Sequence, residues 1–194
     1  MVIMKLLEDR IRKDGVVKPG NIVKIDKFLN HQIDVKFLDE LGAEFYRLFK
    51  DSGVTKLMTI EASGIAIACL AALHFDVPVI FAKKNKTKNI ADEVYKTQVF
   101  SYTHGVFYDV IVSKEFLRKG DKILLIDDVL ANGKALLGLV DLCDQAGAEV
   151  VGAGIVMEKT FQPGRQIMEE KGIRVESLAR ISHIDDGKIT FVGE

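Results

Sequence analysis

Residues 123–135 read ILLIDDVLANGKA, and this stretch decides the fold class. Four apolar residues, a pattern typical of a strand buried on both faces, are followed at once by Asp127 and Asp128. A loop of small residues then leads into residues 134–146, whose apolar positions have helical spacing and which end at Gly147. In a parallel α/β sheet, ligands bind beyond the carboxyl ends of strands, where loops enter helices. The stretch therefore predicts a strand, a ligand-binding loop and a helix.

The predicted geometry suits a sugar phosphate. Two adjacent carboxylates can accept hydrogen bonds from the cis-diol of a ribose. The unpaired amides at the start of the following helix can hold a phosphate, and Gly133 lets the backbone approach it closely. From the pattern alone, an ordinary strand-to-helix turn explains the same residues about equally well.

Two other phosphate-binding patterns are excluded. A Walker loop needs Gly where Asp128 stands and Ser or Thr where Ala135 stands. Gly152 and Gly154 begin a dinucleotide fingerprint, but the third glycine is missing and the pair lies within a predicted strand.

Outward from this stretch, apolar strands alternate with helices. Short apolar runs predict strands at 56–60, 79–82, 122–126, 150–157 and 174–181. Helical spacing predicts helices at 64–75, 134–146 and about 163–171, and a long helix after Asp34 as its N-cap. Less regular are a strand at 22–28, an irregular polar stretch at 83–97, a hairpin at 99–102 and 108–112, and an edge at 189–192. Together they predict an α/β fold with a mostly parallel central sheet flanked by helices.

Composition bounds the function classes. The 194 residues suit one domain, and a net charge of −1 gives no electrostatic reason to expect nucleic-acid binding. The cation run at 83–88 is the local exception and is typical of a solvated loop. The most apolar stretch, residues 57–82, is interrupted by Glu61, His74 and Asp76, so we expect no membrane span and a cytoplasmic location.

The central stretch resembles the phosphoribosyl-pyrophosphate signature of type I phosphoribosyltransferases: four apolar residues, two Asp, three residues, then a small polar residue and Gly. Asn132 and Ala135 stand where that signature usually has Thr. Residues 59–65, TIEASGI, resemble the pyrophosphate loop of the family, and the strand after it ends in Lys83 and Lys84.

The likeness extends over nearly the whole chain. The runs FLNHQ at 28–32, EASG at 61–64, DDVLANG at 127–133 and EKTFQPG at 158–164 resemble the xanthine phosphoribosyltransferases of the Gram-positive type. The resemblance implies a single domain over 1–194, with a core at about 35–158 and a small hood built from about 1–34 and 159–194. It implies purine salvage, in which the 5-phosphoribosyl group passes from phosphoribosyl pyrophosphate to xanthine and gives xanthosine 5'-monophosphate. It also implies Mg²⁺ bound with phosphoribosyl pyrophosphate, and a homodimer.

The resemblance assigns roles by position. Asp127 and Asp128 are the expected catalytic residues on the ribose side. The 5-phosphate loop is expected at Ala131, Asn132, Gly133, Lys134 and Ala135. The pyrophosphate site is expected at Ser63, Gly64, Lys83 and Lys84. The xanthine site is expected at Val23, Asn30 and Lys159. Protein ligands for the metal stay unassigned. Four of these residues also have a simpler structural explanation: Ser63 as a helix cap, Val23 as a core residue, Asn30 as a turn residue and Lys159 as a surface cation.

Two other functions stay open at this point. One is the same transfer to guanine, hypoxanthine or adenine, since the EASG loop also resembles that of adenine enzymes. The other is a non-catalytic regulator that keeps the phosphoribosyl fold as a sensor. Such regulators usually add a DNA-binding domain or a basic face, whereas this chain has a net charge of −1 and no spare segment for a helix-turn-helix.

Overall fold

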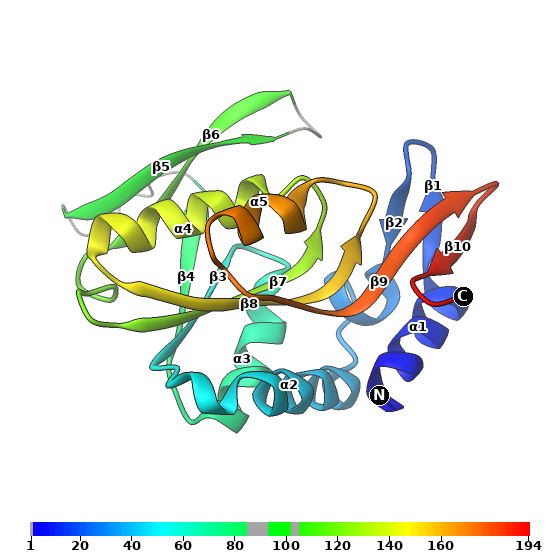
Figure 1. The fold of residues 1–194 in the computed structure, drawn as a ribbon, viewed down its shortest axis with the longest axis horizontal. Helices are drawn as coiled ribbons and strands as arrows, with labels where there is room; N and C mark the ends of the chain where they lie inside the picture. The colour runs from blue at the N-terminus through cyan, green and yellow to red at the C-terminus, as the bar shows by residue number, and fades with distance from the viewer. Residues whose placement is uncertain (1, 85–92, 102–104) are drawn as a thin grey trace.

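A computed structural model describes residues 2–84, 93–101 and 105–194 and is built on one large mixed sheet. Its eight strands lie in the order β10-β9-β8-β7-β3-β4-β6-β5 (Figure 1). The five central strands are parallel: β3 (Lys56–Ile60), β4 (Val79–Lys84), β7 (Lys122–Leu130), β8 (Glu149–Lys159) and β9 (Val175–Asp185). The antiparallel edges are β10 (Lys188–Phe191) on one side and the hairpin of β5 (Val94–Ser101) and β6 (Val106–Ser113) on the other.

Helices cover both faces of this sheet (Figure 1). Helices α2 (Val35–Phe49) and α3 (Gly64–Phe75) lie on one face, and α4 (Lys134–Ala146) and α5 (Gly164–Glu170) on the other. Each face has its own buried core, one around Phe45 and Phe49 of α2 and one around Leu136 and Leu139 of α4. The predicted α/β fold with a mostly parallel sheet flanked by helices is confirmed.

The two ends of the chain meet beside β9 (Figure 1). The N-terminal part comprises α1 (Val2–Asp14), a small antiparallel sheet of β1 (Val16–Lys18) and β2 (Ile22–Lys24), and the π-helical turn η1 (Asp26–Asn30). Arg12 of α1 pairs with Glu194, whose carboxylate also accepts a hydrogen bond from the amide of Phe191 at 3.1 Å. This is the region predicted as the hood; its boundaries with the core stay a prediction.

The strand expected at 22–28 is wrong beyond Lys24. Phe28 and Leu29 are neighbours and both are fully buried, which an alternating strand with one buried face does not allow. The chain turns helically instead, with the amide of Leu29 donating to Ile25 O at 3.1 Å and that of His31 to Asp26 O at 3.1 Å. Asn30, the last residue of this turn, lies within hydrogen-bond distance of Asp128 in β7.

Several strands are longer than predicted, and the differences in β7 and β5 matter most here. The pairing of β7 with β8 continues to Leu130 opposite Glu158, so Asp127 and Asp128 lie within the strand and not after it. Residues 94–97, predicted to be irregular, belong to β5, which packs on α4 so closely that a Cβ at Gly138 would lie 2.5 Å from Val99 Cγ2. Residues 85–92, in the middle of that predicted polar stretch, lie outside the described residues.

Other predicted elements are confirmed. Helices α3 and α4 run over the predicted 64–75 and 134–146, and the Asp34 carboxylate caps α2 by accepting from the amide of Phe37 at 3.3 Å. Within the described ranges, every helix is too short or too polar to cross a lipid bilayer.

Candidate active site

The loop between β7 and α4 is shaped by its own side chains. The amide oxygen of Asn132 accepts a hydrogen bond from the backbone of Lys134 at 3.0 Å, which holds the turn into the helix. Gly133 has φ +77°, and a Cβ there would lie 3.0 Å from the Cα of Gly164. Only glycine fits this turn without strain. The loop also packs against the start of α5, where the amide of Gly164 donates to Ala131 O at 2.9 Å.

The two aspartates have different surroundings. Asp127 is 6% exposed, while Asp128 is only half-buried and donates its amide to the Asp127 carboxylate at 3.0 Å. Burial raises the pKa of Asp127 well above its ordinary value, the charge of Asp128 adds to this, and the charge of Lys84 opposes it. Of the pair, Asp127 is thus the carboxyl group that holds a proton more readily than usual.

Asn30 and Asp128 lie 98 residues apart in the chain and meet here. The Asn30 side-chain amide donates to the Asp128 carboxylate at 2.9 Å. Asn30 is the last residue of η1, and Asp128 lies near the carboxyl end of β7. A residue expected at the purine site and one expected at the ribose thus touch each other.

Lys159 is a buried cation and not a surface one. It is 9% exposed, and its ammonium group donates to the carbonyl of Asn21 at 2.8 Å. Burial lowers its pKa. Asn21 lies in the turn of the β1–β2 hairpin, two residues before Val23, which is buried in the core of the α2–α3 face. The structure thus joins Lys159 to the hairpin that carries Val23, and joins Asn30 to the acid pair.

The loop between β3 and α3 is tied to the end of β4. The amide of Glu61 donates to Ala82 O at 3.0 Å, and its carboxylate accepts from the amide of Lys84. The peptide bond between Glu61 and Ala62 is cis. Among the described residues, the Ser63 side chain caps no amide of α3, so the simple capping role is not seen. Gly64 is enforced by packing, because a Cβ there would lie 1.9 Å from the Thr59 hydroxyl oxygen.

Lys83 and Lys84 point to opposite faces of β4, as successive strand residues do. The Lys84 ammonium lies 5.5 Å from the ring centre of Tyr108, and its charge acts on Asp127. Burial and the charge of Asp127 raise the pKa of Tyr108. The side chains of Lys84, Tyr108 and Asp127 therefore lie near one another. Tyr108 was not predicted from the sequence as a residue of this site. Tyr108 lies two residues before buried Val110 and therefore on the same face of β6.

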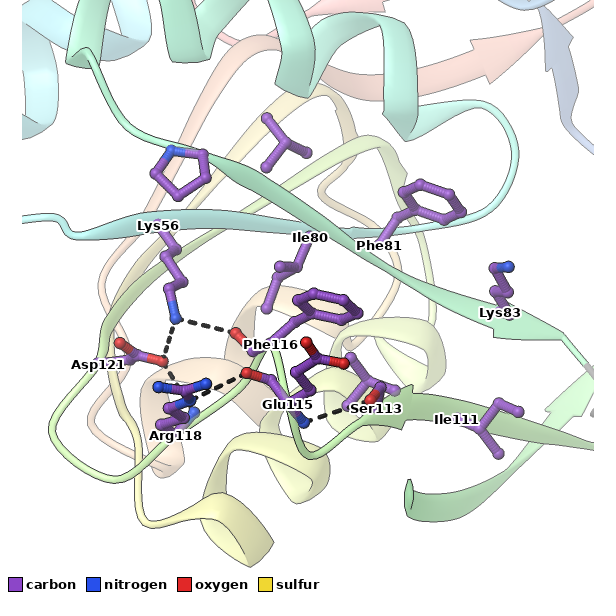
Figure 2. A pocket seen from close by; sticks show the side chains of 13 residues that line it. Lys56, Ile80, Phe81, Lys83, Ile111, Ser113, Glu115, Phe116, Arg118 and Asp121 are labelled. Carbon is purple, nitrogen blue, oxygen red and sulfur yellow. Dashed lines mark hydrogen bonds and ion pairs between the residues drawn. The ribbon is translucent and has the colours of Figure 1, made fainter. Parts of the chain in front are cut away.

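Lys83 lies on the other face, 5.8 Å from the Phe81 ring centre. It lines a cavity of about 850 Å³ between the diverging strands β4 and β6 (Figure 2). There the Lys56 ammonium binds the Asp121 carboxylate at 2.6 Å and Phe116 O at 2.9 Å. The structure brings Lys84 to the acid pair and places Lys83 in this separate cavity. In the part of the chain described, no group of three or more His, Cys, Asp or Glu side chains is arranged to bind a metal ion.

Known proteins resemble this chain over nearly its full length. The model of the phosphoribosyl transferase domain family matches residues 25–181. A protein of Lachnoclostridium phytofermentans named xanthine phosphoribosyltransferase is 55% identical over 193 residues, covering 98% of this chain and 100% of that protein. One of the same name from Staphylococcus aureus is 53% identical over 191 residues, with the same coverage of both chains.

Solved structures agree on the fold. APRTase from Giardia lamblia, complexed with 9-deazaadenine, matches with a TM-score of 0.79 and 24% identity over 93% of this chain and 98% of that chain. Adenine phosphoribosyltransferase from Rhodothermus marinus matches with a TM-score of 0.76 and 22% identity over 93% and 99%. At such identities these two show the fold alone. The family model and the full-length relatives show more: this chain belongs to the phosphoribosyl transferase domain family.

Proposed function

We propose that this chain transfers the 5-phosphoribosyl group of phosphoribosyl pyrophosphate to xanthine, giving xanthosine 5'-monophosphate and pyrophosphate in purine salvage. The observation that carries the proposal is the 2.9 Å hydrogen bond from Asn30 to Asp128, which puts a purine-site candidate against the acid pair at the phosphate loop. The names of the relatives at 52–55% identity support xanthine as the base.

In this reaction a ring nitrogen of the base attacks C1 of the ribose. The bond from C1 to the pyrophosphate oxygen breaks and its electron pair leaves with pyrophosphate, while the base nitrogen loses its proton. The transition state has the charge of an oxocarbenium ion, as in glycoside hydrolysis. The protein acts mainly by positioning the two substrates and by stabilising charge.

The proposed roles follow the places of the side chains. Asp127 and Asp128 hold the ribose hydroxyls, and the loop of Ala131, Asn132, Gly133, Lys134 and Ala135 holds the 5-phosphate with its amides. The loop at Ser63 and Gly64, with Lys84, faces the pyrophosphate; Lys83 has the weaker claim because it lines the separate cavity.

Xanthine has an oxo group at position 2, and hydrogen-bond donors suit it. The Asn30 amide and the Lys159 ammonium are donors of this kind, and Val23 is the apolar residue proposed for the same site. One N–H of the Lys159 ammonium group already donates a hydrogen bond to Asn21 O, and this bond fixes the direction of the group. Donors at this place suit the 2-oxo group of xanthine better than the C–H that adenine carries at position 2.

Magnesium enters as part of the substrate. It is a hard cation that prefers phosphate oxygens and water and needs few protein ligands. The half-buried Asp128 carboxylate has the oxygen chemistry that the ion prefers. The ion would neutralise the charge of the leaving pyrophosphate.

We also propose that the protein works in the cytoplasm as a homodimer. Phe81 and Phe116 expose 39% and 54% of their surface at the mouth of the cavity in Figure 2, where an apolar face is open to water. A second copy of the chain is the occupant we propose for it. Light scattering after gel filtration checks this: a dimer mass for the native protein that falls to a monomer mass for Phe116→Asp supports it, and a native monomer refutes it.

A panel of bases tests the function. The pure protein is incubated with phosphoribosyl pyrophosphate, Mg²⁺ and xanthine, guanine, hypoxanthine or adenine, and nucleotide and pyrophosphate are measured. We expect the highest kcat/KM with xanthine. A preference for another base by more than about tenfold, roughly 1.4 kcal/mol, contradicts the substrate. Absence of pyrophosphate release with every base contradicts the enzyme and favours a regulator.

A further inference from the structure

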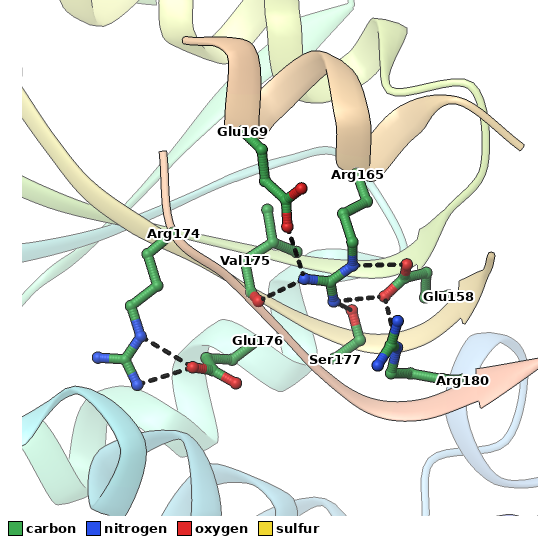
Figure 3. A network of polar contacts seen from close by, with 8 residues as sticks. All are labelled: Glu158, Arg165, Glu169, Arg174, Val175, Glu176, Ser177 and Arg180. Carbon is green, nitrogen blue, oxygen red and sulfur yellow. Dashed lines mark hydrogen bonds and ion pairs between the residues drawn. The ribbon is translucent and has the colours of Figure 1, made fainter. Parts of the chain in front are cut away.

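Behind the proposed site lies a buried ion pair (Figure 3). The Glu158 carboxylate is 1% exposed and receives two parallel hydrogen bonds from Arg165, from Nε at 2.8 Å and from Nη2 at 2.7 Å. Burial opposes ionisation of Glu158, but the hydrogen bonds of Arg165 and Ser177 and the charges of Arg165 and Arg180 lower its pKa below the ordinary value. The pair is therefore charged and geometrically fixed.

Arg165 also holds the start of α5 against the sheet. Its Nη1 donates to Val175 O of β9 at 3.0 Å and reaches Glu169, one turn further along α5, at 3.3 Å. Arg180 stands behind, with Nε 3.6 Å from the Glu158 carboxylate. Within the described ranges that Nε is buried without a hydrogen bond, so Arg180 contributes charge and not a fixed geometry.

The ion pair connects the two ends of the turn from Glu158 to Arg165. One end adjoins the proposed purine site, and the other adjoins the phosphate loop. Glu158 precedes Lys159, which is held to Asn21. Arg165 follows Gly164, whose amide donates to Ala131 O of the phosphate loop at 2.9 Å. The residues between them therefore join the end of β8, which carries the purine-site lysine, to the loop that begins α4.

We propose that Arg165 is a positioning residue for the transfer reaction: by gripping Glu158 it fixes Lys159 relative to the phosphate loop, so that purine and phosphoribosyl pyrophosphate are held in register. The inference rests on the proposed function for its substrates, and on the geometry of the turn for its mechanism. Loosening the pair should weaken the binding of both substrates while the reacting groups themselves stay intact.

Three variants separate positioning from folding. Arg165→Lys keeps the charge but loses the two-pronged geometry. Arg165→Met combined with Glu158→Leu removes both members of the pair, an exchange that often preserves stability. It also removes the counter-charge of Arg180, whose side chain is 41% exposed and keeps access to water. The matched control is Arg174→Gln. Arg174 also pairs with a glutamate, with Nε and Nη2 both 2.8 Å from one oxygen of Glu176, but this pair is exposed to water and lies away from the turn (Figure 3).

We expect the double variant and Arg165→Lys to raise KM for both substrates by about tenfold or more while kcat changes by less than about threefold. Arg174→Gln should match the native protein. KM values within about twofold of native in a folded double variant would overturn the proposal. If the double variant does not fold, the same criterion applied to Arg165→Lys decides.

A second readout does not depend on the substrates. Hydrogen exchange measures how firmly the amides of residues 131–135 are held. We expect faster exchange there in Arg165→Lys than in native protein and Arg174→Gln, with exchange in α2 unchanged. Equal exchange at the loop in all three proteins overturns the positioning role. A native protein that is inactive with every base refutes the proposed function, and the exchange result still decides the role of Arg165.

Discussion

Gly164→Ala is the sharpest steric test of the phosphate loop. A Cβ at position 164 would lie 2.5 Å from Ala131 O, which is about 0.9 Å inside the 3.4 Å at which ordinary contact begins. It would also lie 2.6 Å from Leu130 Cδ1 and 3.0 Å from the amide of Gly133. Since two of these three neighbours are backbone atoms, the loop must shift by most of that distance.

A displacement of about 1 Å at a positioning element can cost about 10²-fold in rate. We therefore expect kcat/KM for phosphoribosyl pyrophosphate to fall by about 10²-fold, which corresponds to about 2.7 kcal/mol. Overpacking should also lower the free energy of unfolding by about 1–3 kcal/mol. Initial rates of pyrophosphate release at saturating xanthine give the first value, and urea denaturation followed by circular dichroism gives the second.

The matched control is Gly42→Ala, at the crossing of α2 and α3. A Cβ there would lie 2.8 Å from the Cα of Ala71, so the steric conflict with backbone is similar and the site is remote. We expect a similar loss of stability with kcat/KM near native. If both variants lose the same small fraction of activity, the loop at Gly133 does not hold the 5-phosphate, and the reasoning is refuted.

Three further predictions follow from single contacts. Asn30→Ala should lower kcat/KM for xanthine by about tenfold or more, through loss of the donor beside Asp128. Because Asn30 is exposed, the urea midpoint should stay native, and a large fall in that midpoint would point to a structural role. Lys84→Gln should raise KM for phosphoribosyl pyrophosphate more than Lys83→Gln, since Lys84 faces the acid pair; the reverse order would contradict this assignment. The lowered pKa of Glu158 contributes stability that is present above its unfolded value near 4.5 and is lost as pH falls through the folded value, at about 1.4 kcal/mol per unit of lowering. When the free energy of unfolding is measured from pH 7 to 3, it should fall less steeply in Glu158→Gln than in the native protein. An equal fall in both proteins would show that Glu158 makes no such contribution.

The parts of the fold that depend on local sequence were predictable. The strand, loop and helix around Asp127 follow from apolar runs and a glycine with positive φ, because each is determined by its own residues. The turn at residues 26–30 was not predictable, since it forms to bury Phe28 and Leu29 together in a core that α1 and α2 also line. The same holds for the length of β5, which is stabilised by packing on α4.

The site divides along the same line. The phosphate loop and the acid pair could be found from chemistry and spacing in one stretch of chain. The contact of Asn30 with Asp128 and that of Lys159 with Asn21 span 98 and 138 residues. The family resemblance indicated Asn30 and Lys159 as purine-site residues, but neither contact was predicted. The sequence could not show which of Lys83 and Lys84 faces the site, because it does not tell which face of β4 turns toward the acid pair.

The position of the two aspartates inside β7 explains why they are not equivalent. Successive side chains of a strand point to opposite faces, so adjacent acids are placed in different environments. Asp127 turns to the face of Tyr108 and Lys84, where burial raises its pKa. Asp128 turns to the face of Asn30 and accepts its amide hydrogen bond. A strand that ended before the pair, as the sequence suggested, would leave both carboxylates in one solvated turn. The longer strand instead gives one protonatable acid on the side of Lys84 and one acceptor on the proposed purine side, and a ribose bound across this edge would meet both.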